Sequence, residues 1–355
     1  MYERELEALR RFGRFRKRQI FDPTLKDFAS NDYLGLAHNK ELLDRAYRRV
    51  RDFPINAAKA SLLINGYTAI HQEFEEYLCR LNGFEAAITV GSGFLANIAL
   101  IEALVRKGDI LFMDEEFHAS GMLASRLVDR VVLFAHNDPE DLRRKLQKFS
   151  YKRAIVAVEG IYSMSGDILD PEIFEVAKDA LLIVDEAHSA GVVGDRLLGV
   201  YDLYAIAIAP NHIKMGTMGK ALGSYGAYIL ASKEIVSFLE NRAKSVIYTT
   251  ALSLMDVALA FEGLQEIEKR LHYYKEQIQI RQDIAKEFGY ERAGLIIDVP
   301  KKDVLKVQQE LLKKGFLVGA IRPPTVKEPM IRVIARIGES KEDLQEVLSC
   351  LVAND

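Results

Sequence analysis

Apolar residues in the middle of the chain occur in short, uninterrupted runs rich in Val, Ile, Leu and Ala. Gly, Asp or Asn bounds each run, and stretches with helical spacing, such as His71–Leu81 and Asn97–Val105, separate the runs. Continuous apolar runs that alternate with helices indicate strands buried on both faces, as in a mostly parallel sheet. The predicted strands are Ala86–Val90, Ile110–Met113, Val131–Ala135, Ala154–Val158, Leu181–Val184 and Tyr204–Ala209, with Tyr225–Ala231 as a hairpin-like return.

The pattern changes in the last third of the chain. A long polar-rich helical stretch over Leu252–Gly289 leads into alternating helical and strand-like segments, which predict a smaller α+β unit. We therefore expect an α/β protein with an N-terminal arm (1–35), a large α/β domain (36–250) and a small C-terminal α+β domain (251–355). The last domain is predicted to contain a helix over Lys302–Lys314, strands over Phe316–Ile321 and Ile331–Ala335, and a helix over Lys341–Ala353 that Ser340 and Asp343 begin with a capping box.

Composition and charge narrow the functional class. The formal net charge of −3 gives no reason to expect a nucleic-acid partner. Cys79 and Cys350 lie far apart and match no metal or redox spacing, so we expect a reducing compartment and no metal site. No apolar run approaches the roughly 18 residues that span a bilayer, and the N-terminus is charged where a signal peptide would be apolar. We expect a soluble, cytoplasmic protein without membrane contact.

Candidate chemistry follows the predicted strands, because ligands of a parallel α/β sheet gather at the carboxyl ends of its strands. Asp185 comes directly after Leu181–Val184. A buried carboxylate must be paired, either in a structural salt bridge or helix cap, or with the cationic ring nitrogen of a cofactor. Lys220 ends the segment Gly216-Thr217-Met218-Gly219-Lys220. Its small neighbours would let a planar ligand approach the backbone, although a solvated loop lysine explains the same pattern.

Two further segments supply complementary groups. Ser92, Gly93 and Phe94 form a turn ahead of a predicted helix, where free N–H groups and the helix dipole favour a phosphate. Thr217 offers a hydroxyl for a phosphate oxygen, and His118 suits a ring platform, a general base or a satisfied buried position. An anion turn, a ring platform, an acid for a ring nitrogen and a lysine for an aldehyde together fit pyridoxal 5'-phosphate (PLP) better than NAD, ATP or a metal.

Several short motifs sharpen this picture: Ser30–Leu36, Asn65–Tyr67 with His71, Ser92–Asn97, Phe117–Ser120, Glu159–Met164, Asp185–His188 and the Lys220 segment. In these motifs, over nearly its whole length, the chain resembles the α-oxoamine synthases, a family of PLP enzymes of the fold-type I class. The resemblance implies a large, mostly parallel sheet domain, a smaller C-terminal domain and a homodimer. Phe134–Asp138 and Ala320–Val326 resemble the alanine-using, oxononanoate-forming branch more than the glycine-using members.

The resemblance also implies roles for individual residues. Lys220 would form the Schiff base with the cofactor and move the proton at the substrate Cα. Asp185 would hold the ring nitrogen, and His118 would stack on the ring. The other implied contacts are His188 and Ser163 at the ring phenolate oxygen, Ser92, Gly93, Phe94 and Thr217 at the phosphate with Thr249 or Thr250 from the partner subunit, Glu159 lining the site, and Asn31 and Arg332 at the substrate carboxylate.

The implied reaction is the decarboxylative condensation of L-alanine with a pimeloyl thioester, carried by acyl carrier protein or CoA. The products are 8-amino-7-oxononanoate, an intermediate of biotin biosynthesis, CO2 and the free thiol carrier. The main alternative is another member of the family, such as a ligase that joins glycine and acetyl-CoA to give 2-amino-3-oxobutyrate. A non-catalytic subunit is disfavoured, because such a protein would have lost its lysine, and Lys220 is present together with His118 and Asp185.

Two segments depart from the family or add to it. Asn56–Ser61 stands where relatives carry a Gly/Ser-rich stretch near the active-site entrance, so contacts to the acyl donor are not carried over. The six basic residues between Arg10 and Arg18 are most simply a solvated helix face. The alternative is a surface that steers an acidic carrier protein.

Overall fold

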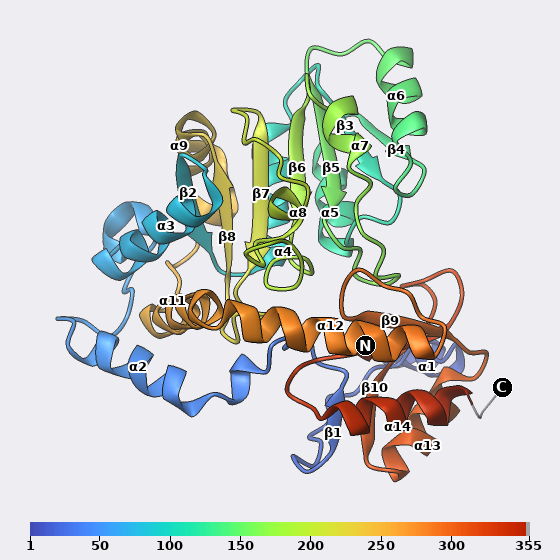
Figure 1. Ribbon diagram of the computed structural model, residues 1–355. Helices are drawn as coiled ribbons and strands as arrows, with labels where there is room; N and C mark the ends of the chain where they lie inside the picture. Colours follow the sequence, from blue (N-terminus) through green and yellow to red (C-terminus); the bar gives the residue numbers. More distant parts are fainter. Residues whose placement is uncertain (353–355) are drawn as a thin grey trace.

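The computed structural model of the protein describes residues 1–352, which build two sheets (Figure 1). The large sheet has the strand order β2-β8-β7-β6-β5-β3-β4, in which β8 runs antiparallel to both of its neighbours and the other paired strands are parallel. The mostly parallel α/β sheet predicted from the apolar runs is therefore confirmed. Its strands are β2 (Ala86–Val90), β3 (Ile110–Asp114), β4 (Val131–Phe134), β5 (Ala154–Glu159), β6 (Leu181–Asp185), β7 (His212–Thr217) and β8 (Ala227–Ala231).

Continuous apolar runs are needed because helices cover both faces of this sheet. Successive side chains of a strand point to opposite faces. Ile155 and Ala157 of β5 thus join one hydrophobic core, and Val156 and Val158 join the other. The α-helices between residues 36 and 270 are α2 (Lys40–Arg51), α3 (Ala69–Asn82), α4 (Gly93–Leu104), α5 (Ala119–Ala124), α6 (Pro139–Lys148), α7 (Glu172–Val176), α8 (Val200–Leu203), α9 (Lys233–Arg242), α10 (Lys244–Ile247) and α11 (Leu254–Lys269).

The small sheet joins the two ends of the chain. Its order is β1-β10-β11-β9, with β1 parallel to β10 and the other pairs antiparallel. The N-terminal segment thus supplies an edge strand to the C-terminal domain, which the expected arm over 1–35 did not include. The elements are β1 (Lys26–Phe28), β9 (Ile296–Pro300), β10 (Phe316–Ile321), β11 (Met330–Ile334), α12 (Leu271–Glu287), α13 (Val304–Lys313) and α14 (Lys341–Val352), and Ala353 of the predicted last helix lies outside the described residues.

One predicted strand is wrong. The apolar segment Tyr204–Ala209 is a turn and irregular chain, and the strand that follows β6 in the sheet is β7, over His212–Thr217. Lys214 interrupts the apolar pattern of that strand although it is fully buried. Its ammonium donates to Asn82 Oδ1 at 2.8 Å and to the Leu198 carbonyl, and it lies 3.8 Å from a Glu186 carboxylate oxygen. A charge that is paired in this way can occupy a core strand.

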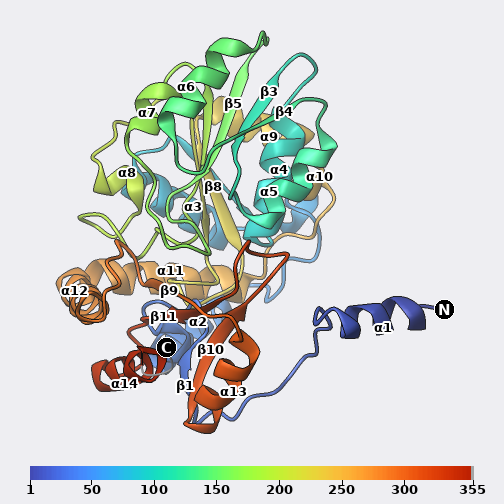
Figure 2. The same ribbon diagram turned by 90° about the vertical axis from the view of Figure 1, so that its right-hand side faces the viewer.

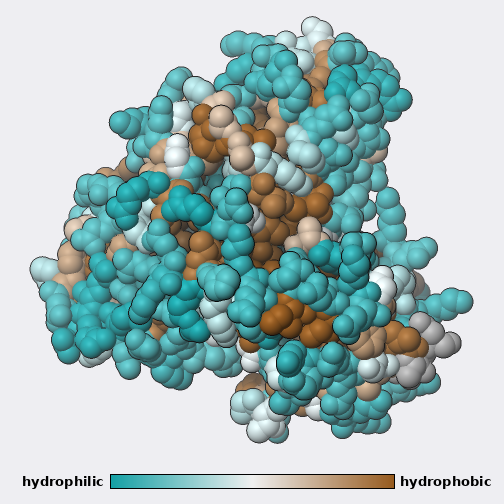
Figure 3. Space-filling model, in the orientation of Figure 1, coloured by the Kyte–Doolittle hydropathy of each residue, from teal (hydrophilic) through white to brown (hydrophobic). Residues whose placement is uncertain are grey.

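The outer surface is largely hydrophilic, with apolar patches in the middle of one face between the large sheet and the C-terminal part (Figure 3). Helix α1 (Glu3–Arg11) projects from the body of the molecule, and all of its residues are exposed (Figure 2). Among residues 1–352, no helix combines the length and apolar character needed to cross a membrane.

Candidate active site

Two carboxylates lie side by side where the central strands end. Glu159 closes β5 and Asp185 closes β6, and the strand register pairs these two residues directly. Both are almost completely buried, at 1% and 4% exposure. Burial, followed by the neighbouring Asp185, raises the pKa of Glu159 well above its ordinary value. Burial and the neighbouring acid both disfavour the charged form of Glu159, so its neutral form is favoured.

A chain of hydrogen bonds orients Asp185 and connects it to His118. Asn97 of α4 donates from Nδ2 to Asp185 Oδ2 at 2.8 Å and to Ser120 Oγ at 2.9 Å, and the Ala187 N–H donates to Asp185 Oδ1 at 2.9 Å. Ser120 Oγ lies 2.7 Å from His118 Nδ1. Burial lowers the pKa of His118. The hydrogen bond at Nδ1 thus holds the His118 ring in place, and the lowered pKa favours its neutral form.

Lys220 lies within reach of His188. Its Nζ is 2.7 Å from His188 Nε2, and His188 Nδ1 is 2.5 Å from the Tyr33 hydroxyl. Burial lowers the pKa of His188 well below its ordinary value, and burial also lowers the pKa of Lys220 to about 8. Lys220 can therefore present an unprotonated amine near neutral pH, as a nucleophile or a base requires.

Gly223 holds the Lys220 loop in place. Its φ of +63° lies in the left-handed region that glycine tolerates. A Cβ at this position would stand 2.7 Å from the backbone of Leu36 and Ala37. A larger residue would push the loop away from the N-terminal segment that carries Tyr33.

Arg332 joins the small domain to this site. Its Nη1 donates to the Ser163 carbonyl at 2.7 Å and its Nη2 to Asn31 Oδ1 at 3.3 Å, while its buried Nε has no partner. Arg336, four residues further along the chain, is instead enclosed in ion pairs with Asp27 and Asp32. The geometry therefore favours Arg332 as the free guanidinium for a substrate carboxylate.

The predicted phosphate residues are only partly brought together. Ser92 caps α4 by accepting from the Leu95 N–H at 3.2 Å, and a Cβ at Gly93 would lie 3.8 Å from the Met215 side chain of β7. The first N–H groups of the helix, including those of Gly93 and Phe94, have no partner within the helix. Thr217 follows at the end of β7, where its hydroxyl donates to the Gly226 carbonyl at 3.0 Å. The turn and Thr217 thus share one edge of the sheet.

Thr249 and Thr250 lie elsewhere. Thr250 pairs with Ser61 in an isolated β-bridge. Within the described part of the chain, neither threonine hydrogen-bonds to another of the predicted site residues. Their expected contact with the phosphate from a partner subunit therefore stays a prediction.

A cleft of about 930 Å³ opens at His118 and Ser163. Loop 324–330 of the C-terminal domain forms the facing wall. Apolar groups predominate on the inner surface, which includes Phe117, Met122, Leu123, Tyr162 and Met164. This cleft suits an extended apolar group that must reach the lysine site.

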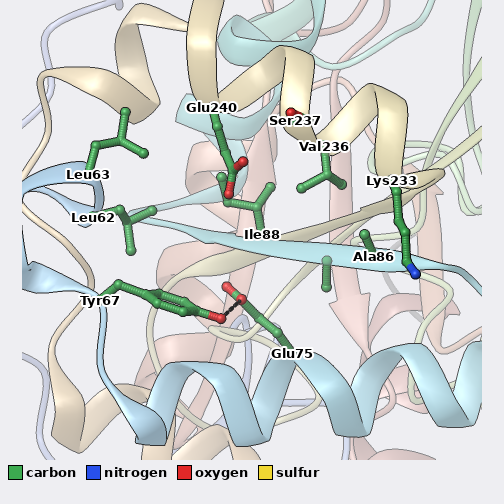
Figure 4. Close-up of a pocket in the computed structure, with 11 residues that line it drawn as sticks. Leu62, Leu63, Tyr67, Glu75, Ala86, Ile88, Lys233, Val236, Ser237 and Glu240 are labelled. Carbon is green, nitrogen blue, oxygen red and sulfur yellow. Dashed lines mark hydrogen bonds between the residues drawn. The ribbon is translucent and has the colours of Figure 1, made fainter.

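A second cavity, of about 380 Å³, lies at the β2 edge of the large sheet and shares no residue with this site (Figure 4). Burial raises the pKa of its Glu75 to about 7. The carboxylate of Glu75 already accepts from the Tyr67 hydroxyl and from both the N–H and the hydroxyl of Thr89, at 2.7 to 2.9 Å. These bonds satisfy the buried acid, and the other polar residues that line the cavity are Lys233, Ser237 and Glu240.

The residues present fit PLP. Asn97 Oδ1, Glu159 Oε1 and Arg332 Nε are buried without partners, so the site has unused polar atoms of both kinds. An accessible lysine amine, the Asp185 carboxylate, whose two oxygens each accept one hydrogen bond, a histidine ring and a helix N-terminus match the aldehyde, ring nitrogen, ring face and phosphate of that molecule. Among residues 1–352, no group of His, Cys, Asp and Glu side chains is arranged to hold a metal.

Comparison with known proteins decides the family. The model of the aminotransferase class I and II family matches residues 23–351. The chain belongs to this family. It is 44% identical to the 8-amino-7-oxononanoate synthase of Helicobacter pylori strain J99, over 99% of the chain and 97% of that relative. It is 33% identical to a putative 8-amino-7-oxononanoate synthase of Aquifex aeolicus, over 98% of the chain and 97% of that relative.

Solved structures show the same fold. The serine palmitoyltransferase of Sphingomonas wittichii superposes with a TM-score of 0.86 at 25% identity, covering 99% of the chain and 96% of the other protein. The 8-amino-7-oxononanoate synthase of Francisella tularensis gives a TM-score of 0.77 at 24% identity, covering 94% and 98%. The resemblance to α-oxoamine synthases inferred from the sequence is confirmed, and so is the fold-type I architecture.

Three polar residues of the site had no role assigned from the sequence: Tyr33, Asn97 and Ser120. Asn97 carried a usable signal, because a polar side chain stands among the apolar residues of α4. A buried polar group needs a partner, so its position already pointed to a strand end. Tyr33 and Ser120 carried no such signal, since their contacts join segments that are distant in sequence.

Proposed function

We propose that this protein is a PLP-dependent acyltransferase that condenses L-alanine with a pimeloyl thioester and releases CO2, free thiol carrier and 8-amino-7-oxononanoate, in biotin biosynthesis. One observation carries the proposal: Lys220 has a lowered pKa, and the partly buried Arg332, whose Nε has no partner, donates to the carbonyl of Ser163, a residue of the apolar cleft. The high identity to 8-amino-7-oxononanoate synthases over the full chain supports this choice of substrates.

The side chains of this site would hold the cofactor and the amino acid separately. Asp185 would accept from the ring nitrogen, His118 would cover one face of the ring, and His188 with Ser163 would contact its phenolate oxygen. When bound, PLP supplies an aldehyde that captures amines and a ring that withdraws electrons from the substrate Cα. The expected contacts of the other groups are Ser92, Gly93, Phe94 and Thr217 at the phosphate, Glu159 beside the ring, and Arg332 with Asn31 at the alanine carboxylate.

Lys220 would carry the proton in both halves of the reaction. Its unprotonated amine accepts the Cα proton of alanine, and this carbon then forms a bond to the thioester carbonyl carbon while the thiolate leaves. The bond between Cα and the original carboxylate breaks to release CO2, and Lys220 returns a proton to Cα. Arg332 holds the carboxylate until that step, which fixes the orientation of the bond that must break.

We further propose a cytoplasmic homodimer. Large apolar side chains are exposed beside the Ser61–Thr250 bridge, including Leu63 at 51%, Ile64 at 78% and Tyr248 at 80%. A second copy that covered this surface could bring Thr249 or Thr250 to its neighbour's phosphate site. Among residues 1–352, Cys79 and Cys350 are not joined in a disulfide, which is compatible with a reducing compartment. Sedimentation of the holoenzyme at the mass of one chain would contradict the dimer.

Steady-state kinetics test the reaction. With L-alanine and pimeloyl-acyl carrier protein or pimeloyl-CoA, we expect CO2 release and 8-amino-7-oxononanoate in equal amounts. Glycine with acetyl-CoA should turn over far more slowly, and activity with this second pair alone would replace the proposal by the glycine-using alternative. Lys220→Ala should abolish the visible absorption of the purified protein, while Lys233→Ala, a lysine at the second cavity, should retain it.

A further inference from the structure

His136 lies outside the proposed catalytic site, in a cluster of acids behind the wall of the cleft. Its Nδ1 is 3.2 Å from Asp114 Oδ1 and its Nε2 is 3.3 Å from Asp167 Oδ2, with a Glu116 oxygen at 3.8 Å. These acids come from the end of β3 and from the turn after β5. The histidine therefore bridges two segments that are separate in the sequence.

Both ring nitrogens of His136 face carboxylates, and a carboxylate can only accept a hydrogen bond. The bridge is therefore complete only when both nitrogens carry protons. Burial lowers the pKa of His136, but hydrogen bonds to Asp114 and Asp167 outweigh burial and raise it to about 10. At neutral pH the residue is an imidazolium.

The same cluster fixes Tyr162. Asp114 is completely buried and accepts from the Tyr162 hydroxyl at 2.7 Å through its second oxygen. The Tyr162 ring packs edge-on against the His136 ring, with centroids 4.3 Å apart. The Tyr162 N–H donates to the Asp167 carbonyl at 2.9 Å, which closes the turn between the two residues. His136 thus contacts this turn at both of its ends.

This turn is one wall of the cleft, since Tyr162, Ser163, Met164 and Ser165 all line it. Ser163 has an anchor of its own, because its N–H donates to a Glu159 carboxylate oxygen at 3.1 Å. The part of the turn beyond Ser163 has no such link to the lysine site. Loss of the bridge should therefore disturb the cleft wall more than the contact between Ser163 and Arg332.

We infer that His136, as an imidazolium between Asp114 and Asp167, is a positioning residue that holds the Tyr162–Asp167 turn in the shape that binds the acyl chain. The inference rests on the proposed function, because it assigns the cleft to the acyl donor. The bridge sets affinity for the acyl thioester and leaves amino-acid binding at Lys220 nearly unchanged.

The test uses the holoenzyme and four variants. His136→Asn, which removes both bridging bonds at every pH, should raise KM for pimeloyl-CoA about fivefold, as expected from the loss of about 1 kcal/mol of binding energy. The affinity for alanine, followed by spectral titration without any acyl donor, should change less than about twofold. Glu175→Gln removes one carboxylate from an exposed pair with Lys178 and serves as the control for charge.

Asp167→Asn tests the role of His136 through the pH dependence of KM for pimeloyl-CoA. A merely structural role of His136 would not change this pH dependence. The amide oxygen can still accept from the imidazolium, but the pKa of His136 falls when one carboxylate is removed. Asp114, Glu116 and the Tyr162 ring remain around the histidine, while Arg292, which acts on Asp167, keeps its own ion pair with Asp298. In this variant KM for pimeloyl-CoA should rise between pH 7 and pH 9, whereas in wild type and Asp167→Glu it should stay flat.

The outcomes separate the two proposals. If the wild type does not use pimeloyl thioesters, the proposed function fails. If it does, and the variants lower kcat at unchanged KM, or Asp167→Asn shows the wild-type pH profile, the positioning role is overturned. The Asp167 side chain is 46% exposed, so its variants should fold and decide the question even if His136→Asn does not.

Discussion

The lowered pKa of Lys220 predicts how fast the cofactor-free protein captures PLP at different pH values. Only the unprotonated amine attacks an aldehyde. Burial lowers the pKa of this lysine from 10.5 to about 8. At pH 7 roughly a tenth of the amine is then unprotonated, against about 0.03% for an ordinary lysine, a difference of about 300-fold. The capture rate should therefore increase with pH and level off above about 8.

The perturbation that tests the cause is Arg332→Gln. The positive charge of Arg332 lowers the pKa of Lys220, although less than burial does. Removing that charge should move the midpoint of capture to higher pH. Arg322→Gln removes the same charge from an arginine whose Nε donates to the Gly13 carbonyl in the arm, and should leave the midpoint unchanged.

Stopped-flow absorbance at the visible band of the bound cofactor measures this rate. Cofactor-free protein is mixed with excess PLP between pH 6 and pH 10. A midpoint near 10.5 in wild type would mean that burial does not act on the amine. An unchanged midpoint in Arg332→Gln would show that the Arg332 guanidinium does not lower the pKa of Lys220.

Three further predictions concern other contacts. Arg336→Met should lower the free energy of unfolding by about 3–5 kcal/mol in urea titrations, because Asp27 and Asp32 lose a buried partner. Replacing both aspartates by Asn in the same variant should restore part of the loss. Full stability of Arg336→Met alone would refute the reasoning. Tyr33→Phe removes a hydrogen bond to His188 worth about 1 kcal/mol, so kcat should fall about fivefold with unchanged circular dichroism. If the arm steers an acidic carrier protein, charge reversal at Arg14, Arg16 and Arg18 should slow the reaction with pimeloyl-acyl carrier protein at low salt but not with pimeloyl-CoA; equal rates would identify the arm as a plain solvated surface.

The sequence predicted the elements whose patterning is local. Ala86–Val90 and Phe316–Ile321 are strands over the predicted bounds, because a continuous apolar run needs no partner to be recognised. The strand His212–Thr217 was missed because Lys214 breaks the apolar run. The burial of Lys214 depends on Asn82 and Glu186, which are distant in sequence. Strand β1 was missed because three residues carry no periodicity, and its pairing with β10 is entirely non-local.

The candidate site follows the same division. Asp185 could be placed by its position directly after a predicted strand, whereas Lys220 was noticed for the small residues around it, because the strand that precedes it was missed. The contacts of Tyr33 with His188 and of Asn97 with Asp185 join segments that are distant in sequence. The spacing of residues along the chain therefore could not identify these partners. His136 belongs to a motif that the sequence offered only as a mark of one branch of the family. Its distances to two acids give that motif a physical role.

The pairing of β1 with β10 determines when the N-terminal segment can dock during synthesis of the chain. Lys26 stands opposite Phe316 in this sheet, so the segment that carries Asn31 and Tyr33 is made long before β10 and docks only when β10 appears. Closing so long a loop is slow on the scale of folding. Asn31 cannot meet Arg332 before then, since Arg332 lies on β11. A nascent chain with a finished large sheet would hold Lys220 without the arginine, and so remain unable to orient an amino acid until β11 has been made.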